Sequence, residues 1–269
     1  MNLTPKHIVV VTSEFPPQPG GIGNHAYNLV LYLSKNAYEV TVITDQRAAS
    51  NESEKIFDAA LPFVVKRIRL KTFRVFMYIN RIIKTFQTIK NADFIIATGK
   101  FSLWNVALCT FFIKRPTMAV IHGSEVNFKS SSLRQTTNAS LIRFDTIVAV
   151  SNYTKQLVAN LKKDVVVIPN GIDLTQWVSN VKKIQLKGAP VITTVGRVST
   201  RKGQLQVIKI LPTLLNKYPD IHYHCVGIQG ESEAFLAEAK QLGVEAHLTF
   251  HGVLNNGDLK RVLSATDVF

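Results

Sequence analysis

Short runs of β-branched apolar residues alternate with longer amphipathic stretches along most of the chain, and this alternation limits the possible folds more than any other feature. Strand and helix periods that take turns predict parallel strands joined by crossover helices, with helices on both faces of each sheet. The first series comprises His7–Thr12, Ile22–Ser34, Glu39–Thr44, Phe73–Ile89, Asp93–Ala97, Phe101–Ile113, Thr117–Ile121, Thr146–Val150 and Ser151–Leu161. The second comprises Val191–Gly196, Gly203–Tyr218, His222–Gly227, Glu231–Leu242, His247–His251 and Asn255–Ala265. The expected fold class is α/β, with two Rossmann-type, doubly wound parallel sheets.

The two series are separated by Pro169-Asn170-Gly171, a turn signal that is followed by a polar stretch without clear period. We therefore expect an N-terminal domain at 1–170, an interdomain crossing at 171–189 and a C-terminal domain at 190–269. The last part is long enough for about three strand–helix units, whereas a doubly wound sheet usually has about five or six strands. Because Asp267-Val268-Phe269 resembles the start of another buried strand, the second domain is expected to be truncated.

The composition narrows the possible function classes. Of 269 residues, 46% are hydrophobic and 19% charged, which excludes disordered, collagen-like and coiled-coil chains. The net charge of +14 favours anionic partners such as nucleotide diphosphates or anionic lipid. Nucleic acid is not expected, because neither aromatic platforms nor a recognised reading motif occurs.

No targeting, disulfide or metal pattern is evident in the sequence. The longest nearly apolar run, Val106–Ile113, is far shorter than the roughly 18 residues of a spanning helix, and the N-terminal run Ile8–Val11 is too short for a signal peptide. A cytoplasmic location is expected. Cys109 and Cys225 lie far apart, so we expect buried thiols, no metal site and no cofactor.

A glycine-rich loop follows the first predicted strand and includes Gly20, Gly21 and Gly23. Glycines at a helix N-terminus let backbone N–H groups approach a phosphate or a sugar closely. The spacing also matches the dinucleotide fingerprint in outline, but eight residues separate the strand from Gly21, where that fingerprint has the glycine directly after the strand. A dinucleotide oxidoreductase is therefore disfavoured, and a merely permissive turn stays open as an alternative.

A basic loop follows the first strand of the second series. It runs from Gly196 to Gly203 and carries Arg197 and Lys202 just before a predicted helix. A guanidinium fork and a point charge on one strand–helix loop suit the oxygens of a diphosphate. We predict a phosphate site here.

Five signals occur in the order found in glycosyltransferase family 4, the retaining enzymes with the GT-B fold, and the chain resembles that family from His7 to Phe269. The signals are Gly20-Gly21, His122-Gly123, Val150-Ser151-x-Tyr153, Ile168-Pro169-Asn170-Gly171-Ile172-Asp173 and Gly196-Arg197-x4-Lys202-Gly203. The resemblance implies transfer of a sugar from a nucleotide-diphosphate sugar to a hydroxyl of a glycan or lipid-linked acceptor, with retention of configuration. In this family an acidic loop that binds the donor sugar lies beyond the point corresponding to Phe269.

The resemblance also implies roles for individual residues. His122 would touch the donor sugar, and Arg197 with Lys202 would hold the diphosphate leaving group. The glycines implied in donor or acceptor binding are Gly20, Gly21, Gly123, Gly196 and Gly203, and the implied hinge residues are Asn170, Gly171 and Asp173. Two alternatives stay open: an inactive fragment or one piece of a split transferase, and, less favoured, a nucleotide-sugar epimerase.

Residues 66–90 form a basic segment within a stretch that lacks acidic residues from Asp58 to Asp93. Its eight basic residues are Lys66, Arg67, Arg69, Lys71, Arg74, Arg81, Lys84 and Lys90. Apolar residues recur among them at helical spacing, so an amphipathic helix with a basic flank is predicted. We favour packing of this helix on its own sheet. The alternative is peripheral contact with anionic membrane at its inner face, or with a lipid-linked acceptor.

Overall fold

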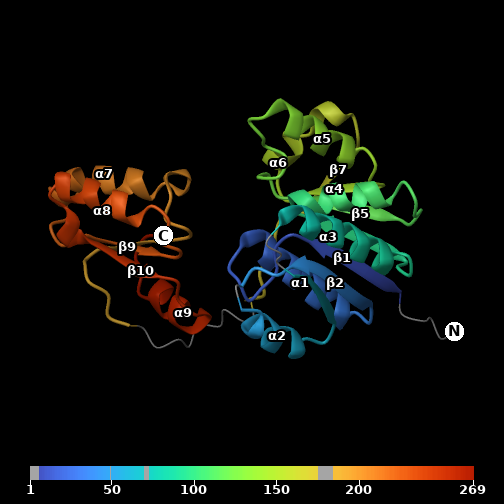
Figure 1. The fold of residues 1–269 in the computed structure, drawn as a ribbon. Coiled ribbons are helices and arrows are strands. Elements are labelled where there is room, and N and C mark those ends of the chain that lie inside the picture. Colours follow the sequence, from blue (N-terminus) through green and yellow to red (C-terminus); the bar gives the residue numbers. More distant parts are fainter. Residues whose placement is uncertain (1–5, 49, 70–72, 175–183) are drawn as a thin grey trace. The chain divides into compact units, whose positions relative to one another are not determined.

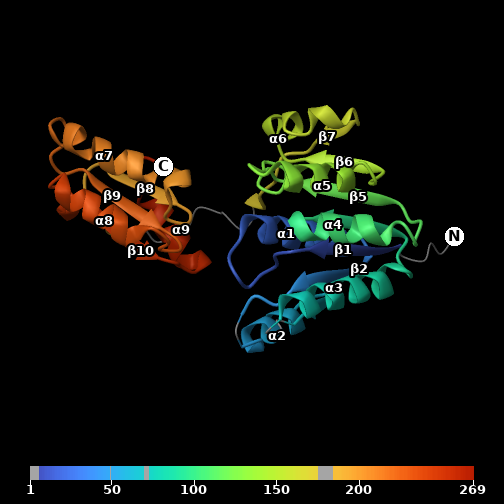
Figure 2. The same cartoon turned by 45° about the horizontal axis from the view of Figure 1, so that its top comes forward.

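The structure, a computed structural model, describes residues 6–48, 50–69, 73–174 and 184–269. The chain divides into two units, Met1–Gly171 and Ile172–Phe269, called unit 1 and unit 2 below (Figures 1 and 2). Part of the predicted interdomain crossing, residues 175–183, lies outside the described residues. The domain boundaries proposed from the sequence stay a prediction.

Unit 1 is built on a parallel seven-stranded sheet with the order β3-β2-β1-β4-β5-β6-β7. The strands are β1 (His7–Thr12), β2 (Glu39–Asp45), β3 (Val64–Ile68), β4 (Phe94–Thr98), β5 (Thr117–Ile121), β6 (Thr146–Ala149) and β7 (Val165–Val167). Successive strands are added on one side of β1 as far as β3 and then on its other side from β4 onward. The order of the strands thus reverses between β1 and β4, which is where open α/β sheets bind ligands beyond the carboxyl ends of their strands.

Both faces of this sheet are covered by helices because its strands are apolar on both sides. In β1, Val9 and Val11 belong to one buried cluster, while Ile8 and Val10 belong to the other. Helices α1 (Gly21–Lys35) and α2 (Glu52–Ala59) pack on the side of Ile8. The side of Val9 is covered by α3 (Arg74–Ile89), α4 (Lys100–Cys109), α5 (Ser131–Leu141) and the segment that contains α6 (Asn152–Gln156) and η1 (Ala159–Leu161).

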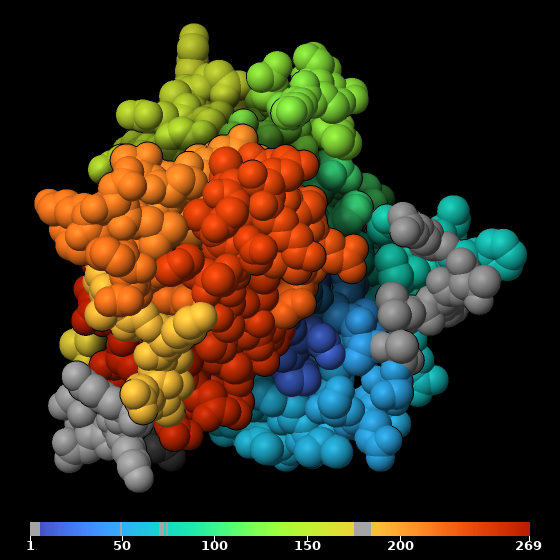
Figure 3. Space-filling model, turned by 90° about the vertical axis from the view of Figure 1, so that its left-hand side faces the viewer, coloured from blue at the N-terminus to red at the C-terminus, as the bar shows by residue number. Residues whose placement is uncertain are grey.

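Unit 2 has a parallel three-stranded sheet, ordered β10-β9-β8, as the length of the second series predicts. The elements are β8 (Val191–Val195), η3 (Thr200–Lys202), α7 (Gln204–Leu215), β9 (His222–Val226), α8 (Ser232–Gln241), η4 (Glu245–His247), β10 (Leu248–Gly252) and α9 (Asn256–Ser264). Helices α7 and α8 cover Tyr223 and Cys225, and α9 lies across the strands from them (Figure 1). The orange-to-red atoms of unit 2 form a continuous surface in Figure 3. Val268 forms a parallel bridge with Ile192, so the strand-like pattern at the end of the chain does pair with β8.

The sequence predicts the fold class correctly, but α2, β3 and α5 of unit 1 have no counterpart among the predicted elements. Helix α5 was missed because it is polar and buries two hydroxyl side chains, Thr137 and Ser140. Strand β3 and helix α2 were both missed. The charged Arg67 interrupts the apolar pattern of β3, and in the structure it is paired with Asp58 of α2 at 2.7 Å. The long helices predicted at 101–113 and 151–161 are shorter in the structure, since α4 ends at Cys109 and the second segment divides into α6 and η1. Both cysteines are buried, as expected.

Candidate functional site

A pocket of about 350 Å³ opens at the carboxyl edge of the unit 1 sheet, where the strand order reverses. It is built from the segments that follow four neighbouring strands, together with the start of α1. Its lining residues are Ser13, Glu14, Ile22, Asp45, Arg47, Lys100, Phe101, Ser124 and Glu125. None of them was selected from the sequence as a site residue, although Ser124 and Glu125 directly follow the predicted His122-Gly123 pair.

Several charged groups around this pocket are held by contacts within unit 1. Arg81 donates two hydrogen bonds to Asp45, and burial raises the pKa of that carboxyl, although Arg81 opposes the shift. Arg47 donates to the backbone carbonyls of Gln18 and Pro19 and thereby holds the glycine-rich loop. A Cβ at Gly20 would lie 2.2 Å from Glu14 Oε2, so the glycine leaves space for that carboxylate. The pocket therefore offers both hydrogen-bond donors and acceptors with little unbalanced charge.

His122 follows β5 directly, as predicted, and lies beside polar groups from two other segments. Its Nε2 is 2.9 Å from Thr98 Oγ1 at the end of β4, and its ring lies 4.7 Å from that of His25 on α1. Burial lowers the pKa of His122 to about 4, and burial together with His122 lowers the pKa of His25 to about 4. Both rings are therefore neutral near pH 7 and able to exchange hydrogen bonds with an uncharged hydroxyl.

The turn after His122 is held by Glu125, a carboxylate that is 2% exposed. Its Oε1 accepts the backbone N–H of His122 at 2.5 Å, and Ser124 donates its hydroxyl to Oε2 at 3.2 Å. Gly123 has φ of +114°, a conformation that a side chain disfavours. Burial raises the pKa of Glu125, and the hydrogen bonds that it accepts oppose that shift. Glu125, Thr98 and His25 were missed in the sequence, although Glu125 lies only three residues after His122.

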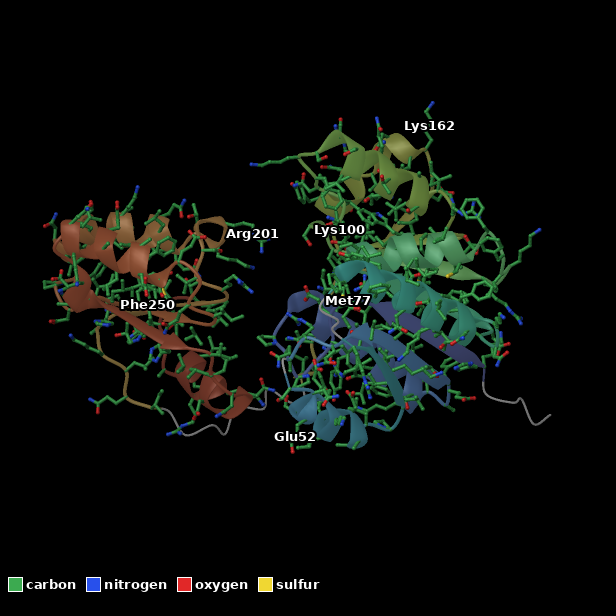
Figure 4. The ribbon with its side chains drawn as sticks, in the orientation of Figure 1. Glu52, Met77, Lys100, Lys162, Arg201 and Phe250 are labelled. Atoms are coloured by element: carbon green, nitrogen blue, oxygen red, sulfur yellow. The ribbon has the colours of Figure 1, made fainter. Side chains whose placement is uncertain are left out.

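Unit 2 carries the predicted basic loop between β8 and α7. Gly196 and Gly203 bound it with φ of +152° and +85°. Arg197, Arg201 and Lys202 are exposed on it, and in the described part of the chain none of them is joined to a carboxylate by an ion pair (Figure 4, Arg201 labelled). A loop with free cations and a following helix N-terminus has the features of an anion site.

Two side chains beyond the predicted motif fix the shape of this loop. Gln204 is fully buried; its Nε2 donates to the Arg197 carbonyl at 3.2 Å and its Oε1 accepts the Ser199 N–H at 3.3 Å. Glu231 accepts the N–H and the hydroxyl of Thr200 at 3.1 and 2.7 Å. The loop conformation is thus set by groups on α7 and just before α8. The sequence contains no pattern that would have singled them out.

The structure gives the positions of the remaining predicted site residues but does not test their proposed roles. Gly21 is the first residue of α1, and a Cβ there would meet no atom within 4 Å. Asn170 and Gly171 are exposed at the end of unit 1, and Asp173 follows them in unit 2. Their assignment as a hinge stays a prediction.

The basic segment 66–90 has the predicted helix, but its two faces differ from expectation. Arg81 is only 6% exposed and is paired with Asp45, so its assignment to an exposed basic flank was wrong. Conversely, Val75, Phe76, Ile79 and Ile83 are 47–64% exposed instead of packing on the sheet. Lys71 lies outside the described residues. Within the described part of the chain, no helix is both long and apolar enough to span a bilayer.

The histidines of unit 2 lie on β9, β10 and the turn before β10. His222 and His224 are each 2% exposed. His224 Nδ1 is 2.9 Å from His251 Nε2, and His247 Nδ1 is 2.8 Å from the Ile221 carbonyl. Among the described residues, no group of three or more His, Cys, Asp or Glu side chains has the arrangement of a metal site.

Comparison with known families gives two adjoining matches. A family profile described as Glycosyltransferase Family 4 matches residues 19–176, and one described as Glycosyl transferases group 1 matches residues 178–269. A GDP-mannose-dependent monoacylated alpha-(1-6)-phosphatidylinositol monomannoside mannosyltransferase from Corynebacterium glutamicum is 25% identical over 97% of this chain and 71% of its own length.

Solved structures with the same fold include glycosyltransferases. HepE from Anabaena, in complex with UDP and glucose, superposes with a TM-score of 0.75 at 19% identity, over 97% of this chain and 72% of its own. Sucrose-phosphate synthase from Thermosynechococcus elongatus gives a TM-score of 0.78 at 15% identity, over 97% and 74% of the two chains. These similarities confirm the predicted GT-B class of fold.

Proposed function

Since the chain belongs to Glycosyltransferase Family 4, we propose that it transfers a sugar from a nucleotide-diphosphate sugar to an acceptor hydroxyl with retention of configuration. The observation that carries the proposal is the loop Gly196–Gly203 at the start of a helix, where Arg197 and Lys202 are exposed and form no ion pair with any residue that the structure describes. Negative charge accumulates on a diphosphate as its bond to the sugar breaks. Fixed positive groups at that position lower the barrier.

Arg197 and Lys202 have different tasks at this diphosphate. The guanidinium of Arg197 suits two oxygens at once, whereas Lys202 supplies a compact charge. The aliphatic part of Lys202 lies beside Gly196, because a Cβ on Gly196 would be 3.8 Å from Lys202 Cε. In the retaining mechanism that the family resemblance implies, the diphosphate also accepts the proton of the acceptor hydroxyl on the same face. These two cations then neutralise the leaving group without a metal ion.

We assign the acceptor to the pocket of unit 1 and the donor sugar to His122. The basic and acidic side chains of the lining, Arg47 and Lys100 beside Glu14, Asp45 and Glu125, offer donors and acceptors to a hydroxyl-rich ligand without favouring a strong net charge. His122, neutral by virtue of its lowered pKa, is suited to a sugar hydroxyl. The mannosyltransferase from Corynebacterium glutamicum is named for a phosphatidylinositol mannoside, so a lipid-linked acceptor is the first class to test here, followed by a glycan.

The donor assignment is tested by calorimetric titration with GDP and with UDP. Replacing either Arg197 or Lys202 with alanine should weaken binding by about 1.5–3 kcal/mol, roughly tenfold to a hundredfold, because each loses charged hydrogen bonds. Lys202→Arg should restore affinity only partly. The control is Lys209→Ala on α7, whose lysine is exposed and lies 3.5 Å from Glu238, outside the loop. Unchanged affinity in both alanine variants would refute the diphosphate site.

Transfer itself is tested with labelled GDP-mannose and UDP-glucose and a lipid or glycan acceptor fraction. The expected result is label in the acceptor, with the anomeric configuration of the donor preserved in the product by NMR. Inversion would refute the retaining mechanism. Tight nucleotide binding without transfer to any acceptor would instead favour the inactive or split-enzyme alternative.

Peripheral contact with anionic membrane through residues 66–90 is the second part of the proposal. Its support is the exposed apolar side of α3 beside Lys84 and Lys90. Co-sedimentation with vesicles should rise with their phosphatidylglycerol content and fall with salt, since exposed charges are screened beyond about 10 Å at 0.1 M. Replacing Lys84 and Lys90 with glutamine should weaken it. Equal binding to neutral vesicles, or none to any, would refute this contact.

A further inference from the structure

An apolar face is exposed on the outer side of two neighbouring helices of unit 1. We call it the α3–α4 face; α3 and α4 contact each other and lie side by side in Figure 1. Its exposed apolar residues, 43–76% accessible, are Val75, Phe76, Ile79, Ile83, Leu108, Phe111 and Phe112. Scattered apolar residues are normal on a surface, but several on one face of two adjacent helices are typical of an interaction site.

A cavity of about 240 Å³ lies within this face, between the second half of α3 and the end of α4. Its lining is wholly apolar and consists of Ile82, Phe86, Leu108, Cys109 and Phe112. An apolar cavity of about 150 Å³ in another protein stays dry and binds benzene, so this one has room for a longer hydrocarbon group. No polar group of the lining could bind water or the head group of a ligand.

Helix α4 also borders the polar pocket. Lys100 and Phe101, at the start of α4, line the pocket, and Leu108 and Cys109, at its end, line the cavity. Phe101 and Leu108 are seven residues apart in the helix, which places them about 10 Å apart along its axis. The pocket and the cavity thus match the two ends of an amphiphile, one polar and one apolar.

The charge around the α3–α4 face fits an anionic lipid. Apart from Arg67 and Arg81, which are paired with carboxylates, the segment between Asp58 and Glu125 has nine lysine and arginine residues and a single acidic residue, Asp93. Lys84 and Lys90 lie on α3 or directly after it, and Lys114 and Arg115 follow the end of α4. A basic margin around apolar side chains attracts anionic head groups while the apolar groups meet hydrocarbon.

We propose that the cavity between α3 and α4 binds one hydrocarbon chain of an anionic lipid whose head group lies toward the polar pocket. This inference rests on the proposed transfer to a lipid-linked acceptor and extends it. Burying the chain against Leu108, Cys109 and Phe112 removes apolar surface from water on both partners, which is the main source of affinity for such a site. The cavity would hold the acceptor by its tail and leave its head for the pocket.

The test uses tryptophan fluorescence and a lysophosphatidylglycerol with a brominated acyl chain, kept below its micelle-forming concentration. Phe112→Trp places the reporter at the cavity. Phe111→Trp places a matched reporter at the preceding residue, which is exposed but does not line the cavity. The signal of the parent protein is subtracted. We expect saturable quenching of the tryptophan at position 112 and little at position 111. Glycerophosphoglycerol, which has the head group alone, should not compete.

A filling variant is the second arm. Leu108 is 43% exposed, so Leu108→Phe should fold normally, as its melting temperature will verify, while narrowing the cavity. In the Phe112→Trp background it should weaken quenching at least tenfold. No quenching by the monomeric lipid, or equal quenching of both reporters in vesicles only, would overturn the cavity site in favour of general membrane contact. The quenching experiment contains no sugar donor and does not depend on sugar transfer. Its result can therefore be interpreted even if the protein shows no transferase activity.

Discussion

The charged groups of the two candidate sites are arranged in opposite ways. In unit 1 the lining of the pocket carries charges of both signs, Arg47 and Lys100 beside Glu14, Asp45 and Glu125, and Asp45 is paired with Arg81. In unit 2, Arg197 and Lys202 are exposed and, within the described residues, form no ion pair. A lining with both signs of charge has little net attraction for an anion, whereas a loop with cations alone attracts one. The contrast supports a hydroxyl-rich ligand for unit 1 and a diphosphate for unit 2.

The neutral histidines add to this difference. His25 and His122 are kept uncharged by burial beside the pocket of unit 1. The loop of unit 2 has no histidine, and its cations are of the two types that stay charged at neutral pH. The candidate site of unit 2 is therefore suited to binding an anion, and that of unit 1 to hydrogen bonds with uncharged groups.

The largest expected effect concerns the buried pair of unit 1. Arg81→Gln should reduce the free energy of unfolding by about 3–5 kcal/mol, the range for removing one partner of a buried ion pair. Urea unfolding followed by fluorescence measures it. The double variant Arg81→Met with Asp45→Leu should regain much of the loss, because it leaves no unpaired charge. A loss below about 1 kcal/mol in the single variant would mean that the pair behaves like an exposed one.

The next effect concerns the shape of the unit 2 loop. Gln204→Leu removes two hydrogen bonds, each worth about 1 kcal/mol, and leaves two backbone groups of the loop without their partner. GDP or UDP should bind threefold to tenfold more weakly, as expected for a loss of up to about 1.4 kcal/mol. Gln206→Leu, at an exposed position of the same helix, is the control.

A double-mutant cycle separates loop positioning from a general loss of stability. If Gln204 acts through the loop, its substitution should cost little further affinity in the Arg197→Ala background, because coupled residues are non-additive. Fully additive losses would contradict that role.

The smallest expected effect is a dependence of unit 2 stability on pH. Burial, aided by neighbouring histidines and Lys187, lowers the pKa of His222 to about 4, and burial lowers those of His224 and His251. Below the ordinary histidine pKa of about 6.5 the unfolded chain binds more protons than the folded one, so stability falls as the pH falls toward 4. Hydrogen exchange of β9 and β10 amides should accelerate over this range. His222→Phe should make the stability of unit 2 less dependent on pH. An unchanged dependence of the exchange rates on pH would contradict the role of His222.

Much of the fold was predictable because its signals are local. The apolar runs His7–Thr12 and Thr117–Ile121 are strands with the predicted bounds, since a strand buried on both faces needs a continuous apolar run. Strand β3 could not be found in this way, because Arg67 interrupts its pattern and the partner Asp58 lies on another element. The apolar spacing of α3 predicted the helix itself correctly but not its exposed side, because periodicity does not tell what covers a face.

The sequence by itself determined the two parallel α/β sheets, the position of His122 after a strand and the basic loop before α7, all of which depend on neighbouring residues. Only the tertiary structure decided which charges are free. Arg81 and Arg197 look alike in the sequence, but Arg81 meets Asp45 across 36 residues while Arg197 meets no carboxylate within the described chain. The physical reason is that pairing and desolvation depend on distances of a few ångströms between elements, which residue spacing along the chain does not encode.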